Sequence, residues 1–112
     1  MARLSDAPAS RRSTLEVRLI YSTRAFNDLD RLADFLIDTD PVAAGETVEL
    51  ITEAVTILKS HPLIGRPIED NLRALVISRG KTGYVALYSY EVDHDTVLIL
   101  AIRHQRESGF AN

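Results

Sequence analysis

The stretch DPVAAGETVELITEAVTILKSHP, residues 40–62, decides the fold class of this chain. Asp40 suits the N-cap of a helix, and Pro41 suits its first turn, where proline loses no hydrogen bond. Apolar residues then recur at alternating spacings of four and three, which places them on one helical face. They are Ala44, Val48, Ile51, Val55 and Leu58. Pro62 ends the helix, because the residue before a proline avoids helical geometry.

A second helix is predicted just before this one, over residues 24–38. Ser22 or Thr23 suits its N-cap, because a side-chain oxygen there accepts a hydrogen bond from an unpaired backbone N–H. The separation of apolar and polar residues indicates an amphipathic helix. We assign to its core face Phe26, Leu29, Ala33, Leu36 and Ile37, and to its solvent face Asn27, Asp28, Asp30, Arg31 and Asp34. The short link at residues 39–40 predicts an antiparallel helical hairpin.

Strands are predicted on both sides of this hairpin. VRLIY, residues 17–21, is a short β-rich run before it. After turn-rich residues 61–71, strands are predicted over residues 72–78, 84–92 and 96–102, with a glycine-rich turn at 79–83 and a polar turn at 93–95. The unbroken apolar run 96–102 is typical of a central strand. The order β-α-α-β-β-β predicts an α+β fold, in which the helical hairpin packs on a mostly antiparallel sheet.

Length and composition indicate one small globular domain. The chain has 112 residues, 46% apolar and 26% charged, and no cysteine, which excludes disulfides and thiolate chemistry. No apolar run reaches the roughly 20 residues that a membrane-spanning helix needs. We expect a cytoplasmic protein that does not bind a membrane, with a flexible leader over residues 1–15 and a single domain over residues 16–112.

Charge is unevenly distributed along the chain, whose net charge is −3. Residues 22–56 carry two arginines and eight acidic residues, whereas residues 57–112 carry seven basic and six acidic residues. A nucleic-acid-binding domain usually has a net positive charge, because neutralising phosphates supplies its non-specific affinity. The balance therefore argues against avid binding of RNA or DNA, while it leaves room for a local basic patch.

Short motifs, in order, resemble those of the ParE/RelE toxin superfamily over nearly all of residues 17–110. Each motif is weak alone, and the order and spacing make the resemblance specific. The motifs are Ala25-x-x-Asp28-Leu29, Asp40-Pro41-x-Ala43-Ala44, Leu58-x-x-x-Pro62-x-x-Gly65-Arg66, Leu72-Arg73, Gly83-Tyr84-x-x-x-Tyr88, and strand 97–102 running into Arg103, His104, Arg106 and Glu107. The resemblance implies a ParE/RelE-like fold, no cofactor, and a plasmid-stabilising toxin held inactive by a separate antitoxin.

The resemblance implies two different activities. RelE-like members cleave messenger RNA on the ribosome, whereas ParE-like members inhibit DNA gyrase without being hydrolases. Cleavage needs a base, an acid and cations for the developing phosphorane charge. The residues that could supply them are Arg73, Arg103, His104 and Arg106. Phe110 stands where the RelE-like pattern often has a catalytic tyrosine, so we favour gyrase inhibition, with the endoribonuclease as the alternative and a non-toxic antitoxin-binding relic as a third.

Predicted partner-binding residues are Arg73, Arg79, Lys81, Tyr84, Tyr88, Arg103 and Arg106. The cations form either a landing site for an acidic peptide or nucleic-acid backbone, or a solvated sheet edge. Tyr84, Tyr88 and Tyr90 share one strand face, where they either fill the core or anchor an interface. Arg66 pairs with an acidic helix residue or with a partner. The polar turn 93–95 offers too few fixed ligands for a metal.

Apolar surface left by the first helix and the sheet is expected to bind the antitoxin, which would fold as it binds. A homodimer through the helical hairpin is the alternative assembly.

Overall fold

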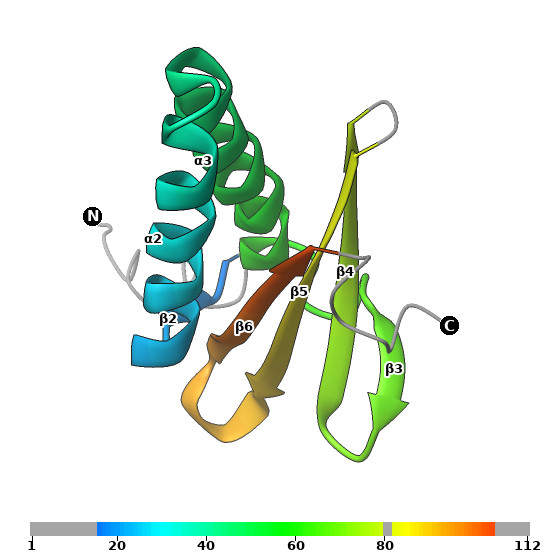
Figure 1. Cartoon of the computed structure of the whole chain (residues 1–112). Coiled ribbons are helices and arrows are strands. Elements are labelled where there is room, and N and C mark those ends of the chain that lie inside the picture. The colour runs from blue at the N-terminus through cyan, green and yellow to red at the C-terminus, as the bar shows by residue number, and fades with distance from the viewer. Residues whose placement is uncertain (1–15, 80–81, 105–112) are drawn as a thin grey trace, which may run out of the picture.

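The computed structural model describes residues 16–79 and 82–104. A helical hairpin covers one face of a five-stranded sheet (Figure 1). The helices are α2, Thr23–Ile37, and α3, Pro41–Val55, which continues into the 3₁₀ turn η1, Thr56–Lys59. The remaining elements are β2, Arg18–Tyr21; β3, Arg66–Glu69; β4, Leu72–Arg79; β5, Thr82–Glu91; η2, Val92–His94; and β6, Thr96–His104. The leader expected at residues 1–15 lies outside the described residues.

The strand order in the sheet is β2-β6-β5-β4-β3. β2 runs parallel to β6, with Arg18 opposite Thr96, and the other three strand pairs are antiparallel. A bulge between β5 and β6 leaves Leu100 without a partner, because Leu87 lies opposite Ala101 and Tyr88 opposite Ile99. This topology confirms the α+β prediction, the mostly antiparallel sheet and the central position of residues 96–102.

β3 is the element that the sequence did not predict. Its four residues are exposed, so no alternation of apolar and polar residues marks them, and one of them is Pro67, which cannot donate to a ladder. At the sheet edge that missing donor is tolerated. The glycine-rich turn is also shorter than predicted, since β4 and β5 pair as far as Arg79 opposite Thr82.

Both helix starts are capped as the sequence predicts. The Ser22 hydroxyl accepts a hydrogen bond from Ala25 N at 3.0 Å, and Asp40 Oδ1 accepts from Ala43 N at 3.1 Å. The α-helical geometry of α3 ends at Val55, earlier than predicted, and the 3₁₀ turn carries the chain to Lys59. No helix in the described part of the chain is long and apolar enough to cross a membrane.

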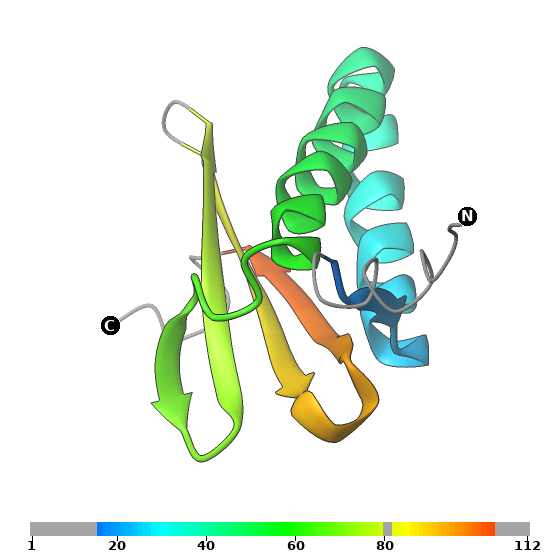
Figure 2. The same ribbon diagram turned by 180° about the vertical axis from the view of Figure 1, so that it is seen from behind.

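The core lies between the helical hairpin and the sheet (Figure 2). Its largest fully buried side chains are Tyr88, Ile51, Leu58, Ile99, Ile102, Val55 and Val97. The prediction for α3 is confirmed, but the core face of α2 is rotated and centres on Ala25, Leu29 and Leu32. Phe26, predicted inside, is 63% exposed, and Asp28, predicted outside, is 7% exposed. Each residue turns a helix by about 100°, so Phe26 falls beside the buried stripe.

Candidate functional site

The loop that joins η1 to β3, residues 61–65, is held from inside by Tyr88 of β5. The Tyr88 hydroxyl donates to the Pro62 carbonyl oxygen at 2.8 Å and accepts from Gly65 N at 2.8 Å. Burial raises the pKa of this hydroxyl, while the Gly65 hydrogen bond and the Arg73 charge act to lower it. The hydroxyl is therefore protonated at neutral pH, as a group that both donates and accepts must be.

Gly65 is required by the close approach of Tyr88. A Cβ atom added at Gly65 would lie 2.6 Å from both Cε1 and the hydroxyl oxygen of Tyr88. Only glycine leaves that space open. The sequence prediction of a fixed turn at Pro62-x-x-Gly65-Arg66 is thereby confirmed. Arg66 itself is exposed on β3, and within residues 16–79 and 82–104 no ion pair joins it to a helix acid.

Arg73 of β4 holds the same loop. Its Nη1 atom donates to the Leu63 carbonyl oxygen at 3.0 Å and to the Gly65 carbonyl oxygen at 2.7 Å. Two of the residues that the sequence assigned to partner binding, Tyr84 and Tyr88, are buried in the core. Tyr84 contributes apolar area, and Tyr88 contributes apolar area and two hydrogen bonds to the loop, so neither side chain offers accessible surface to a partner in this structure.

The C-terminal end of β6 carries the other described candidates, Arg103 and His104. Arg103 lies opposite Val85 and His104 opposite Tyr84. The His104 and Tyr84 rings meet edge to face, with centroids 5.2 Å apart and planes at 83°. His104 therefore shares the helix-covered face with Tyr84, and Arg103 points to the opposite face because side chains alternate along a strand.

The basic residues fall into two groups rather than one. Arg73 of β4 lies opposite Tyr88 of β5, and Arg103 of β6 lies opposite Val85 of β5. The two arginines are therefore offset by three residues along the strands and by two strand spacings across the sheet. This offset separates their Cα atoms by about 14 Å, from strand spacing and rise. Arg79 ends β4 at the same end of the sheet as Arg103, because β4 and β6 are both antiparallel to β5. Lys81 and Arg106 lie outside the described residues.

Asp28 is a buried polar residue that the sequence analysis placed on the wrong face. Its Oδ2 atom accepts a hydrogen bond from Ile102 N at 2.9 Å, and its Oδ1 atom lies 3.2 Å from Nη2 of Arg31. One signal in the sequence could have located it. Asp28 lies three residues after Ala25 and four before Leu32, both on the core face.

The outer surface of the helical hairpin combines exposed apolar and acidic side chains. Phe35 is 74% exposed, and Phe26, Ile37 and Val42 are exposed as well. The two helices and their caps also expose the acids Asp30, Asp34, Asp38, Asp40, Glu46, Glu49 and Glu53. Exposed aromatic side chains in such a setting are typical of a protein-binding surface.

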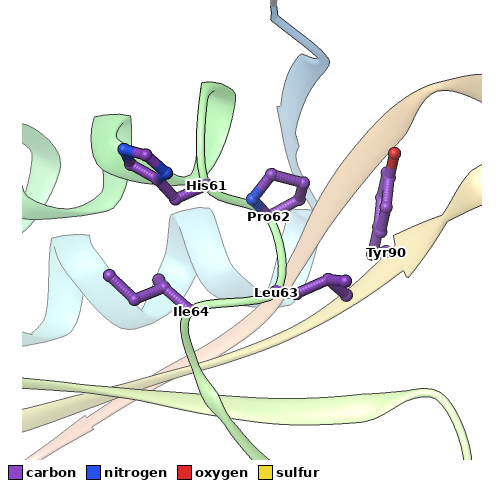
Figure 3. Close-up of a pocket in the computed structure, with 5 residues that line it drawn as sticks. All are labelled: His61, Pro62, Leu63, Ile64 and Tyr90. Atoms are coloured by element: carbon purple, nitrogen blue, oxygen red, sulfur yellow. The ribbon is translucent and has the colours of Figure 1, made fainter.

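A shallow hollow opens beside the anchored loop (Figure 3). It has a volume of about 440 Å³ and is lined by His61, Pro62, Leu63, Ile64 and Tyr90. The lining is mostly apolar, and its two titratable side chains, His61 and Tyr90, lie apart with Pro62 and Leu63 between them (Figure 3). In the ranges 16–79 and 82–104, no group of three or more His, Asp or Glu residues is placed to hold a metal ion.

Known proteins match this chain in sequence and in fold. A family model described as the ParE toxin of the type II toxin-antitoxin system matches residues 19–109. The chain is 38% identical over 84 residues to a protein named Toxin RelE3 of Caulobacter vibrioides, covering 75% of this chain and 89% of the relative. It is 33% identical over 70 residues to Toxin RelE1 of the same organism, covering 62% and 75%.

Two solved toxin-antitoxin structures share the fold. A chain of the chromosomal ParDE system from P. aeruginosa superimposes with a TM-score of 0.66 at 27% identity, covering 80% of this chain and 96% of that one. A chain of the RelBE2 toxin-antitoxin complex from Mycobacterium tuberculosis superimposes with a TM-score of 0.52 at 30% identity, covering 80% and 98%. The likeness thus extends to both the ParE and the RelE branches.

Proposed function

Because this chain belongs to the ParE toxin family of type II toxin-antitoxin systems, we propose that it acts by binding its target, as a DNA gyrase inhibitor, and not by cleaving RNA. The observation that carries this proposal is the dispersal of the residues that could have formed a ribonuclease centre. Arg73 is bonded to two loop carbonyls, and Arg103 and His104 point to opposite faces of β6.

RNA cleavage requires an acid, a base and a cation within hydrogen-bond reach of one phosphate. Arg73 and Arg103 lie on opposite faces of the sheet, because Arg73 is in register with Tyr88 of the core face and Arg103 with Val85 of the other face. The Arg73 guanidinium is also engaged with two loop carbonyls. The net charge of −3 also disfavours docking on ribosomal RNA. Binding to a protein target needs none of these groups to converge.

An antitoxin partner is part of the proposal, since both structural neighbours come from toxin-antitoxin systems. The exposed Phe26, Phe35 and Ile37 of α2 give a partner apolar area to cover. A disordered segment that folds on binding gains affinity by covering such surface. The sheet end with Arg103 is a second candidate contact, because a cation there complements an acidic segment.

The alternative function is a RelE-like endoribonuclease that cleaves messenger RNA on the ribosome. The specific observation in its favour is the match to two Caulobacter proteins that are named RelE toxins. On this alternative the C-terminal end of β6 would act together with Arg106, which lies outside the described residues.

Inducible expression in a bacterial host separates these functions. We expect chromosome breaks with an SOS response and intact transcripts. Rapid cleavage of messenger RNA without DNA damage would overturn the proposal in favour of the ribonuclease. Normal growth together with tight antitoxin binding would instead identify a non-toxic relic.

A matched pair of variants tests the role of the β6 end. Arg103→Glu and Arg18→Glu make the same charge change on one sheet, but Arg18 lies on β2, away from the candidate site. We expect Arg103→Glu to reduce DNA breakage or antitoxin affinity by about tenfold or more, because the reversed charge would repel an acidic segment of the partner. Equal behaviour of the two variants would remove Arg103 from the site.

A further inference from the structure

The hydrogen-bonding partner of β6 changes partway along the strand. β2 pairs with β6 only as far as Tyr21 opposite Ile99, and β6 continues to His104. The last contact from the β2 side is the hydrogen bond from Ser22 N to the Ile99 carbonyl oxygen at 2.9 Å. Within residues 16–79 and 82–104, no strand lies beside this edge of β6 beyond Ile99.

Side chains of α2 take the place of the missing strand. The Ser22 hydroxyl donates to the Leu100 carbonyl oxygen at 3.1 Å, and the Asp28 carboxylate accepts from Ile102 N at 2.9 Å. Ser22 and Asp28 are six residues apart in the helix, a rise of about 9 Å, and they meet backbone groups about 7 Å apart on β6. The bulge at Leu100 lies in the same segment, so the β5 ladder is irregular there too.

Within the described residues, the side-chain carboxylate of Asp28 has two polar partners, Ile102 N and Arg31. A buried carboxylate is costly unless it is paired and hydrogen-bonded. Its pairing with Arg31 lies within one turn of α2 and does not reach the sheet. In the described part of the chain, the bond to Ile102 N is the one polar contact that joins the buried carboxylate to another element.

Arg103 and His104 follow Ile102 directly. We infer that Asp28 is a positioning residue, whose carboxylate fixes the C-terminal end of β6 against α2 and so sets where Arg103 and His104 are presented. The inference rests on the proposed function only in taking this strand end as part of the surface that meets the target or antitoxin. That Asp28 fixes the end of β6 against α2 does not depend on the proposed function.

Four variants of the full chain test this inference. Asp28→Asn keeps an oxygen acceptor for Ile102 N, Asp28→Ala removes it, and Asp28→Glu keeps the charge but displaces it by a methylene. Leu32→Ala is the matched control, because Leu32 is as buried in α2 as Asp28, and its truncation destabilises the core without removing a hydrogen bond to β6. The measurements are amide hydrogen exchange along β6 and DNA breakage on expression.

We expect Asp28→Ala to speed exchange of the Ile102 amide about tenfold beyond what its global stability accounts for. It should also lower DNA breakage more than Leu32→Ala does at equal melting temperature, while Asp28→Asn restores both. If Asp28→Ala fails to fold, Asp28→Glu decides, with NMR shift changes expected at residues 100–104 and reduced DNA breakage.

The inference is overturned if Asp28→Ala and Leu32→Ala behave alike at matched stability. It is also overturned if Asp28→Asn fails as Asp28→Ala does, or if Asp28→Glu matches the wild type. Should the wild-type protein break no DNA, the proposed function fails, and the exchange data alone still decide whether Asp28 holds the strand.

Discussion

Two regions of this molecule are fixed by polar side chains from neighbouring elements, but to very different degrees. The loop at residues 61–65 makes four hydrogen bonds with two side chains, accepting one from Tyr88 and two from Arg73 and donating one to Tyr88. The end of β6 is fixed on its outer edge by two bonds, one from Ser22 and one from Asp28. Losing one hydrogen bond would leave the loop held by three others, whereas on the outer edge of β6 it would leave only one. Rigidity is therefore concentrated in the loop, and the strand end is easier to adjust.

The largest effect is expected from Gly65→Ala. The new Cβ would meet the ring and hydroxyl of Tyr88, which is fully buried and held by its hydrogen bonds to Pro62 and Gly65. We expect a loss of about 3 kcal/mol or more of unfolding free energy, as overpacking of a tight core produces. Urea denaturation checks this, with Gly45→Ala as the control because its Cβ would enter open space. Equal stability of the two variants would show that the loop yields easily.

Tyr88→Phe should cost somewhat less, about 1–3 kcal/mol, because Gly65 N loses a buried acceptor. It should also alter the response to alkali. The folded protein holds the pKa of Tyr88 above its ordinary value of 10.0, so the corresponding stability is complete below about pH 10 and is lost as pH rises through the raised pKa.

The matched test is chemical denaturation from pH 8 to 11. In Tyr88→Phe, the unfolding free energy should fall less at alkaline pH than in the wild type, because the contribution of Tyr88 to that fall is absent. The contribution of Tyr21 should persist, since burial raises the pKa of Tyr21 as well. If the unfolding free energy fell equally steeply with pH in the variant and the wild type, Tyr88 would be excluded as a source of the alkaline decline.

Ser22→Ala addresses the other region and should cost about 1 kcal/mol, the usual value of an N-cap. The hydroxyl caps α2 and also serves the Leu100 carbonyl, which can turn toward water when the donor is lost. Asp40→Ala removes a cap of α3 without any contact to β6. If loss of the Ser22 hydroxyl loosens the strand end, hydrogen exchange at residues 100–102 will rise in Ser22→Ala and stay constant in Asp40→Ala.

The smallest effect is expected from Arg31→Ala, about 0.3 kcal/mol, as for other exposed pairs within one helical turn. Half of the Arg31 side chain is exposed, and its bond to Asp28 is screened by solvent. Thermal unfolding at low and high salt measures it. A loss above about 1 kcal/mol would contradict the small contribution expected of Arg31.

The sequence predicts the fold well because its signals are local. The Asp40-Pro41 start, the apolar spacing of α3 and the apolar run of β6 each lie within one element. It predicts the site less well, because the site depends on long-range contacts. Asp28 resembles a solvent-facing helix acid until Ile102, 74 residues later, provides its partner. Arg73 resembles a free surface cation until the loop carbonyls appear.

The parallel pairing of β2 with β6 has a consequence for synthesis of the chain. Ser22 and Leu100 are 78 residues apart, so the N-terminal strand and helix cap cannot make their contacts with β6 until β6 has been synthesised. At about 5–20 residues per second, a ribosome needs roughly 4–16 s to cover that interval. The β4–β5 and β5–β6 hairpins can form as they emerge, but the helical hairpin has no complete sheet to cover before then. A transcript cut short before the β6 codons would therefore yield a chain that cannot close its core.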